Sequence, residues 1–253
     1  MCPSLRVVRR TLLATAIAAA AASPAVAQPL APVEVTGAAR EIACGPRAAV
    51  APPEPGLIVT GAAAGGRMIF GPGDIVALNA GSAHGLKPGD EFFTRRTIVD
   101  RYEARSRTPS PVAIHTTGWL RVVEVRTDRA SAAVVHACDA IEEGDYLEPF
   151  AVPDVPVTAA GAQADFEHPA RVLFGDEGRQ MGSAGAFMML DRGRAQGLAA
   201  GQRLTVFRAP FDGGPIERVA EATVIVVGEE FATIRIDSSR DAVYVGDRAA
   251  VHR

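Results

Sequence analysis

The stretch LNAGSAHGLKPGD at residues 78–90 returns as LDRGRAQGLAAGQ at residues 190–202, at a constant offset of 112. Both leucines, three glycines at four-residue spacing and one alanine keep their places. A second block matches at an offset of 102, where Val122, Val125 and Gly144-Asp145 return as Val224, Val227 and Gly246-Asp247. Two blocks in the same order, separated by one gap of ten residues, predict an internal duplication.

Each copy has the pattern of short β-strands. Glycine, proline and aspartate interrupt the apolar runs at short intervals, as hairpins require. The runs that predict strands in the first copy are Leu57–Thr60, Arg67–Phe70, Ile75–Asn79, Glu91–Arg96, Trp119–Arg126, Ala130–Ala137 and Tyr146–Glu148. We therefore expect an all-β protein with two tandem small β-barrel-like modules.

The repeat also sets the expected domain boundaries. β module 1 is predicted over residues 57–150 and β module 2 over residues 170–253. Residues 28–56 and 151–169 are rich in proline and alanine and have no periodicity, so they predict a Pro/Ala-rich N-terminal segment and a linker.

Comparison of the two copies assigns the faces of one strand. Ala132 and Val134 match Ile234 and Ile236, which are apolar in both copies and are expected to point inward. Ala133 and Val135 match the charged Arg235 and Asp237, which predicts an outer face.

The repeated glycines indicate a turn. Pro88 and Gly89 suit the two central positions of a type II turn. A nucleotide-binding loop would instead show GxGxxG or GxxxxGK[ST] between a strand and a helix, and we predict no helix after Gly89.

The first 27 residues are typical of a signal peptide. The basic stretch 1–10 leads into the apolar run Thr11–Ala22, which is too short to span a bilayer, and Ala25-Val26-Ala27 is a cleavage pattern before Gln28. A membrane anchor is the alternative. We expect secretion, with the periplasm as the destination, and no integral membrane segment after cleavage.

The composition is that of a folded protein, with 48% hydrophobic and 22% charged residues in 253. The formal net charge is −3, and the three arginines of the signal segment leave −6 on the rest of the chain. A net acidic body argues against a nucleic-acid partner.

Further motifs of module 1 follow one another in a recognisable order. FFTRR at residues 92–96 comes after the GxxxGLKPGD turn, and GWLRVVEV at residues 118–125 and IEEGDYLEP at residues 141–149 come later. This order resembles the β modules of exported bacterial LysM-type cell-wall proteins, and it is similar to the C-terminal domain of the flagellar assembly protein T. The resemblance covers both copies and implies a fold. The sequence has no LysM repeat, so the resemblance implies neither LysM-type peptidoglycan binding nor catalytic residues.

Two cysteines remain after cleavage, Cys44 and Cys138. In an oxidising compartment they could form a disulfide or stay as separate thiols, and sequence leaves both open. Cys138 with His136 could also suggest a nucleophilic thiol, although a cysteine at the edge of the core is the favoured interpretation. Trp119 could stack on a sugar, but a core or rim aromatic is favoured. The sequence indicates no catalytic residue, cofactor or metal site.

The connection formed by residues 97–117 is longer and more basic than its counterpart, residues 209–219. Such connections tend to carry binding residues, and a basic one would attract an acidic partner. A solvated hairpin without a partner is the alternative. The candidate partner-binding residues of this arm are Arg95, Arg96, Arg101, Tyr102, Arg105 and Arg107.

These observations favour a secreted, non-enzymatic envelope protein that acts as a structural or adaptor module. Its expected partner is another cell-envelope protein or a cell-wall polymer. Two alternatives remain, a peptidoglycan- or carbohydrate-binding module and a hydrolase with dispersed catalytic residues.

Overall fold

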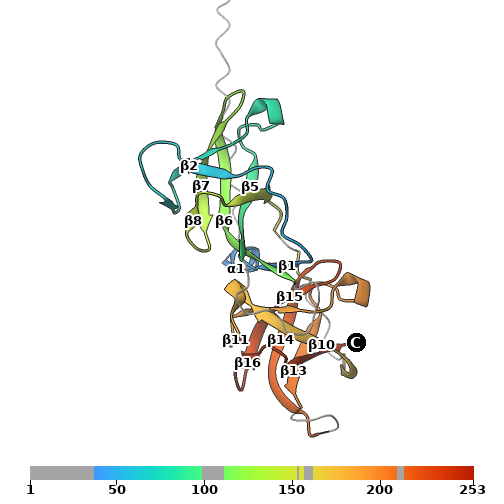
Figure 1. Ribbon diagram of the computed structural model, residues 1–253. Helices are drawn as coiled ribbons and strands as arrows, with labels where there is room; N and C mark the ends of the chain where they lie inside the picture. Colours follow the sequence, from blue (N-terminus) through green and yellow to red (C-terminus); the bar gives the residue numbers. More distant parts are fainter. Residues whose placement is uncertain (1–36, 99–110, 153, 157–161, 210–213) are drawn as a thin grey trace, which may run out of the picture. The chain divides into compact units, whose positions relative to one another are not determined.

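The computed structural model describes residues 37–98, 111–152, 154–156, 162–209 and 214–253 (Figure 1). The expected signal peptide and residues 99–110 of the basic arm lie outside this part. Strands make up about half of the described residues and helices only a small part, so the predicted all-β fold is confirmed.

Six strands form the body of module 1. They are β2 (Val59–Ala62), β4 (Ile75–Leu78), β5 (Glu91–Ile98), β6 (Val112–Val125), β7 (Ala130–Ala137) and β9 (Tyr146–Pro149), arranged in the order β2-β4-β7-β6-β5-β9. The two edge strands approach each other at a bridge between Ile58 and Tyr146, and the Leu147 N–H donates to the Leu57 carbonyl at 2.8 Å. The sheet is therefore barrel-like.

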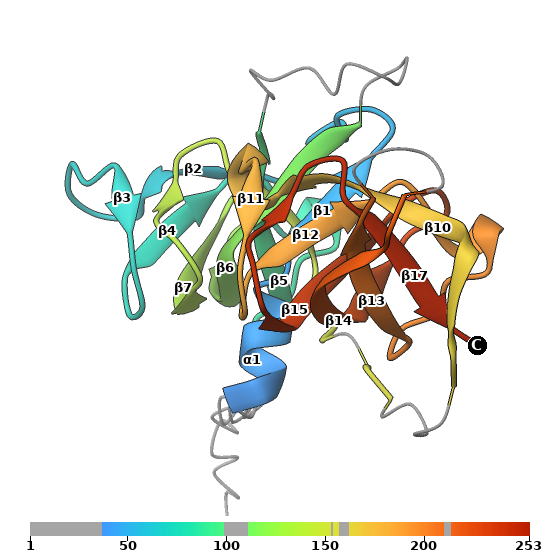
Figure 2. The same cartoon turned by 90° about the horizontal axis from the view of Figure 1, so that it is seen from below.

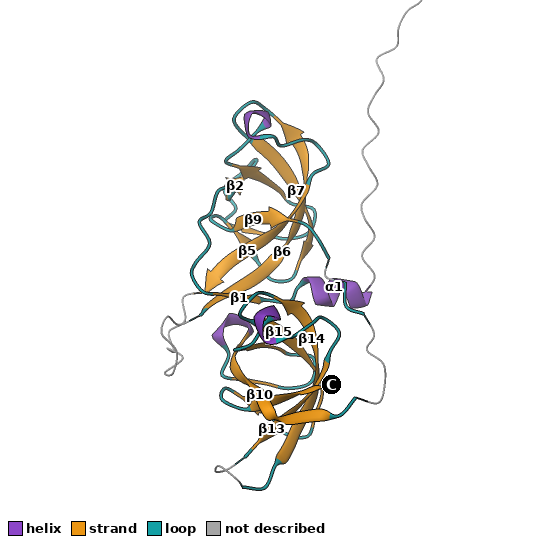
Figure 3. Cartoon of the chain, turned by 90° about the vertical axis from the view of Figure 1, so that its right-hand side faces the viewer, coloured by secondary structure: helices purple, strands orange, loops and turns teal. Residues whose placement is uncertain are grey.

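Module 2 is a closed six-stranded barrel. Its strands are β10 (Ala164–Gly175), β12 (Phe187–Leu190), β13 (Arg203–Arg208), β14 (Glu217–Val227), β15 (Ala232–Ser239) and β17 (Arg248–His252), in the order β10-β12-β15-β14-β13-β17. Figure 3 shows several of these strands surrounding the barrel interior.

The two modules share one topology. Strands β2, β4, β5, β6, β7 and β9 take the same places as β10, β12, β13, β14, β15 and β17. Each module adds a two-stranded ribbon, β3 (Ile69–Phe70) with β8 (Ile141–Glu142) and β11 (Met181–Gly182) with β16 (Val243–Tyr244). This agreement supports the duplication inferred from the repeat.

Apolar side chains fill both modules. Leu120, Val122 and Ala132 belong to the core of module 1, and Val224 and Ile234 belong to the core of module 2. The predicted inner positions, Ala132, Val134, Ile234 and Ile236, are all buried. These buried apolar side chains form one core in each module.

The repeated turn begins with one turn of 3₁₀ helix in each module, η1 (Ser82–His84) and η3 (Arg194–Gln196). A Cβ on Gly81 would collide with the Arg126 carbonyl, which explains the glycine there. The Gly81 N–H donates to His84 Nδ1 at 3.4 Å, and the Gly193 N–H donates to Gln196 Oε1 at 2.8 Å. His84 and Gln196 therefore have the same structural role.

Residues 37–49 differ from the unstructured N-terminal segment that was expected. They form α1 (Gly37–Ala43) and β1 (Arg47–Ala49), and β1 pairs with β6. In Figure 2, α1 lies beside strands of the modules, and Ala43 packs with Phe93 and Trp119. We call residues 37–49 the bridging segment. The prediction failed because this short helix depends on tertiary packing rather than on its own propensity.

The bridging segment contacts both modules. Cys44 is joined to Cys138 of module 1 in a disulfide with a Cα–Cα distance of 5.6 Å. On the other side, the Thr233 hydroxyl donates to the Pro46 carbonyl at 2.7 Å, and Arg235 lies 3.1 Å from Glu41. Gly45 is confined because a Cβ there would lie 2.9 Å from Ile225 Cδ1.

The predicted linker, residues 151–169, is also shorter than expected. β10 begins at Ala164, where it pairs with His252 of β17. Phe166 packs edge-on against Phe207, with ring centroids 5.1 Å apart. The sequence pattern was misleading because Glu167, His168 and Pro169 interrupt the strand at an irregular register.

Candidate functional site

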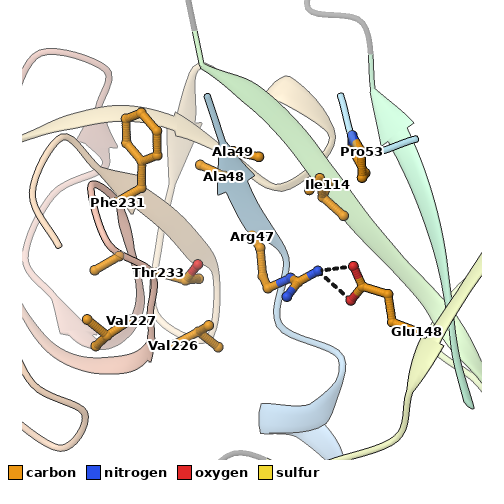
Figure 4. A pocket seen from close by; sticks show the side chains of 12 residues that line it. Arg47, Ala48, Ala49, Pro53, Ile114, Glu148, Val226, Val227, Phe231 and Thr233 are labelled. Atoms are coloured by element: carbon orange, nitrogen blue, oxygen red, sulfur yellow. Dashed lines mark hydrogen bonds and ion pairs between the residues drawn. The ribbon is translucent and has the colours of Figure 1, made fainter. Parts of the chain in front are cut away.

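A cavity of about 260 Å³ lies between the bridging segment and the β14–β15 hairpin (Figure 4). Arg47, Ala48 and Ala49 of β1 line one side, with Ile114 of β6 and Glu148 of β9. Val226, Val227, Phe231 and Thr233 form much of the opposite side. The cavity therefore combines a largely apolar wall with one charged end.

The charged end of the cavity is the pair of Arg47 and Glu148, and the buried Arg95 lies next to this pair without lining the cavity. Figure 4 shows Arg47 pointing toward Glu148, to which it is paired through both carboxylate oxygens. Arg95 Nε lies 3.5 Å from the same carboxylate, and the Arg95 guanidinium also donates to the Thr116 hydroxyl. One carboxylate thus serves two arginines, which leaves a formal charge of +1 on this group.

Burial shifts the pKa of Arg95 and of its neighbour Tyr146. Burial, followed by the neighbouring Arg47 charge, lowers the pKa of Arg95 to about 10. Burial and then the Glu148 carboxylate raise the pKa of the Tyr146 phenol to about 12. Tyr146 is therefore a neutral hydroxyl at physiological pH, and Arg95 is a cation.

Three buried donors of the group have no hydrogen-bond partner among the described residues. They are Nε of Arg47, Nε of Arg95 and the hydroxyl of Tyr146. Buried donors without acceptors are unfavourable, and most native structures satisfy them. An excess of positive charge with unused donors suits an additional acceptor such as a carboxylate.

A second polar cluster surrounds His115 of β6. Its Nδ1 lies 2.8 Å from Asp176 in η2 (Asp176–Gly178), and its Nε2 lies 3.3 Å from Asp139. Burial lowers the pKa of His115, but the Asp176 hydrogen bond and the surrounding carboxylates outweigh this effect and raise it above its ordinary value. This cluster connects module 1 to module 2.

The predicted arm residues are only partly in the described structure. Arg101, Tyr102, Arg105 and Arg107 lie outside it. Arg95 is only 5% exposed, so its assignment as a partner-binding surface residue is wrong. Both ends of the expected connection are strand instead, since β5 extends to Ile98 and β6 begins at Val112.

Arg96 has a structural role. Its Nε lies 2.7 Å from the buried Asp145, and its Nη2 donates to the Ala140 carbonyl at 3.1 Å. In module 2, Arg208 makes the same contacts to Asp247 and to the Ala242 carbonyl, at 2.9 and 3.1 Å. These ion pairs attach the last hairpin of each module to its barrel, and they raise the pKa of both arginines despite burial, which acts in the opposite direction.

The other residues considered for catalysis or sugar binding, Cys138, His136 and Trp119, have structural roles. Cys138 is in the disulfide, so it offers no thiol in this state. A bulge between Trp119 and Leu120 places His136 against the Trp119 ring, with centroids 4.4 Å apart. Trp119 is 3% exposed and therefore has no free face for a sugar.

Sequence reasoning missed Arg47, Tyr146, Glu148 and Phe231 as members of a site. Arg47 lies in a segment that was interpreted as unstructured, and the others are separated from it by about 100 residues or more. The one available signal was a missing counterpart, because the residues described between β9 and β10 contain no strand equivalent to β1.

A scan against models of protein families finds no match, and a search of curated proteins finds no relative. Within the described residues, no helix has the length and apolar character needed to cross a membrane. The resemblance to LysM-associated and flagellar modules therefore stays a prediction.

Proposed function

We propose that this protein is an exported, non-enzymatic adaptor of the bacterial cell envelope that binds an acidic segment of a partner. The observation that carries the proposal is the charged end of the cavity, where Arg47 pairs with Glu148, a carboxylate that also serves the buried Arg95. A carboxylate from a partner would balance the excess positive charge and accept from the guanidinium of Arg47, the arginine that lines the cavity.

The packed cores and the surroundings of three histidines support a binding role rather than an enzymatic one. Both module interiors are packed with apolar side chains. Three of the five histidines participate in local structure: His84 accepts from Gly81, His136 stacks on Trp119, and His252 contacts Thr205 at 2.8 Å. These three histidines therefore give no support to the hydrolase alternative.

The arm and the cavity favour the same partner chemistry. The arm carries Arg101, Arg105 and Arg107, and it would attract a negative segment before contact. The cavity wall of Val226, Val227 and Phe231 would then cover an apolar side chain next to the bound carboxylate. Export is supported by the signal-like N-terminus and by the disulfide, which persists in oxidising compartments.

Binding of a fluorescent glutamate-rich peptide tests the proposal directly. Ala49→Leu should fill the cavity and lower the affinity at least tenfold, whereas Ala51→Leu, an exposed neighbour that does not line the cavity, should leave it unchanged. A lysine-rich peptide of the same length should not bind. Equal binding of both peptides, or an unchanged affinity in Ala49→Leu, would contradict the proposal.

A second experiment separates the two partner classes. Wild type, Ala49→Leu and a triple variant with Arg101, Arg105 and Arg107 replaced by serine are used to capture partners from an envelope extract and are also sedimented with purified cell wall. An adaptor captures a stoichiometric protein that both variants lose. Retention on the wall alone would instead favour the peptidoglycan-binding alternative.

A further inference from the structure

The cluster around His115 gathers side chains from both modules. His115 belongs to β6, Asp139 to the turn after β7, and Asp176 and Glu177 to η2 of module 2. The ligand atoms of His115, Asp139 and Glu177 all lie within 4.8 Å of one another. Sequence analysis gave no indication of this cluster because its members are separated by up to 62 positions and follow no metal-binding spacing.

One ring nitrogen of His115 is held by a hydrogen bond, and the other lies 3.3 Å from Asp139 without forming one. Nδ1 donates to Asp176 Oδ1 at 2.8 Å, and the same oxygen accepts the Glu177 N–H at 3.0 Å. His115 is 6% exposed, and its Nε2 is buried without a hydrogen-bond partner among the described residues. With its proton kept on Nδ1 by Asp176, the ring would offer the Nε2 lone pair to a cation bound beside Asp139.

We infer that His115 Nε2, Asp139 and Glu177 form a binding site for a divalent transition-metal ion, for which Zn²⁺ is the best match. Imidazole with carboxylates is a common ligand set for zinc, with three protein ligands leaving a fourth position for water. At zinc–ligand distances of about 2.0–2.2 Å, tetrahedral ligand atoms are about 3.4 Å apart. His115 Nε2 and Asp139 Oδ2 are already 3.3 Å apart.

Asp176 fits the role of a positioning residue. Histidines that bind a metal usually donate their other ring N–H to a carboxylate, which fixes the ring and increases its basicity. Asp176 is that carboxylate for His115. The two carboxylate ligands, Asp139 and Glu177, and the positioning residue Asp176 thus surround one buried imidazole, that of His115.

The charge of the cluster also suits a cation. Three carboxylates, those of Asp139, Asp176 and Glu177, surround one imidazole, and Arg179 pairs with Glu177 at 2.8 Å. The duplicated position of Asp139 is Asp241, which instead pairs with Arg208 at 3.3 Å. The site is therefore specific to one copy, where it would link η2 of module 2 to module 1.

Zinc titration of the mature, disulfide-intact protein without a histidine tag tests the site. The disulfide keeps Cys44 and Cys138 from offering thiolates next to His136, which is the other group of potential ligands. After chelator treatment and dialysis, calorimetry should show one Zn²⁺ per chain, and bound zinc should raise the midpoint of thermal unfolding. Ca²⁺ and Mg²⁺ should bind more weakly.

Variants identify the ligands. Asp139→Asn and Glu177→Gln change exposed side chains and should lower zinc affinity at least tenfold, and Asp176→Asn should lower it about 10–100-fold. Asp241→Asn is the matched control for Asp139, because each of these aspartates accepts the N–H of the next residue. Glu229→Gln is the control for Glu177, since both pair with an arginine on the surface.

The expected result is loss of zinc binding in the three site variants and normal binding in the two controls. The inference is overturned if the wild type binds no zinc, if the site variants bind it as wild type does, or if the controls lose it equally. Tighter binding of Ca²⁺ than of Zn²⁺ would also overturn it, because that preference would exclude a role for the imidazole. Circular dichroism of each variant separates lost binding from lost folding.

Discussion

Asp145 and Asp247 are buried carboxylates at equivalent positions of the two modules. Asp145 accepts from Arg96 of β5 and from the backbone N–H of Glu142. Asp247 accepts from Arg208 of β13 and from the backbone N–H of Tyr244. Such a carboxylate is stabilised only while all of its donors are present. Its removal leaves a guanidinium and an N–H without their acceptor.

Asp145→Ala and Asp247→Ala should each lower the free energy of unfolding by about 3 kcal/mol, because breaking a buried ion pair leaves one partner uncompensated. Asp128→Ala removes an exposed carboxylate 3.6 Å from Arg129 and should change stability by about 0.5 kcal/mol or less. Urea unfolding of the three variants measures the difference. Similar small effects in all three would show that the buried pairs contribute no more than a surface pair.

Tyr146 leads to a prediction about alkaline pH. Its pKa is about 12 in the folded protein, raised above the ordinary value of about 10 chiefly by burial. Folding therefore favours the neutral phenol, and the associated stability is present below about pH 10 and is lost as the pH rises toward 12. Ultraviolet difference titration should show one late phenol among the three tyrosines. Tyr146→Phe should remove that step and make stability less dependent on pH in this range; a late step that persists would contradict the assignment.

At the scale of elements, the repeat predicted most strands because apolar alternation and turn residues agree in both copies. The alignment of Ala132 with Ile234 identified the inner face, and Pro88-Gly89 identified a turn in which Gly89 has a φ of 94°. The bridging segment could not be predicted in the same way. Its seven-residue helix and three-residue strand have little intrinsic stability and depend on contacts with Thr233, Trp119 and Cys138.

The candidate sites were less predictable than the strands. A repeat reveals what two copies share, whereas Arg47, His115 and Glu177 belong to features that one copy has and the other lacks. Their proximity arises from the tertiary fold, which brings β1 close to β9 and β6 close to η2. Local spacing contains no information about these contacts.

The disulfide between Cys44 and Cys138 gives a prediction about the bridging segment. The bond spans 94 positions, and in the chain-entropy model it contributes about 4–5 kcal/mol. Replacing both cysteines by serine should lower the midpoint of urea unfolding and release the N-terminal part of the segment to protease. A thiol assay on unfolded, unreduced protein should find no free thiol at these positions; two free thiols would exclude the bond.

At the scale of the whole molecule, export gives a further prediction. The small residues Ala25 and Ala27 precede Gln28, and cleavage there leaves a chain that begins before α1. Mass spectrometry of the protein recovered from the periplasm should identify Gln28 as the N-terminus. Recovery of the intact 253-residue chain from the membrane fraction would contradict the signal-peptide hypothesis.

The shared topology of the two modules has a consequence for assembly. Each hairpin of one module has an equivalent hairpin in the other module of the same chain, and again in every neighbouring molecule. Native strand pairing therefore competes with pairing between equivalent hairpins that have exchanged places. Exchange between molecules would produce intertwined oligomers. The bridging segment contacts β6 and β15 and has no counterpart among the described residues of module 2, so it favours the native pairing over the exchanged one.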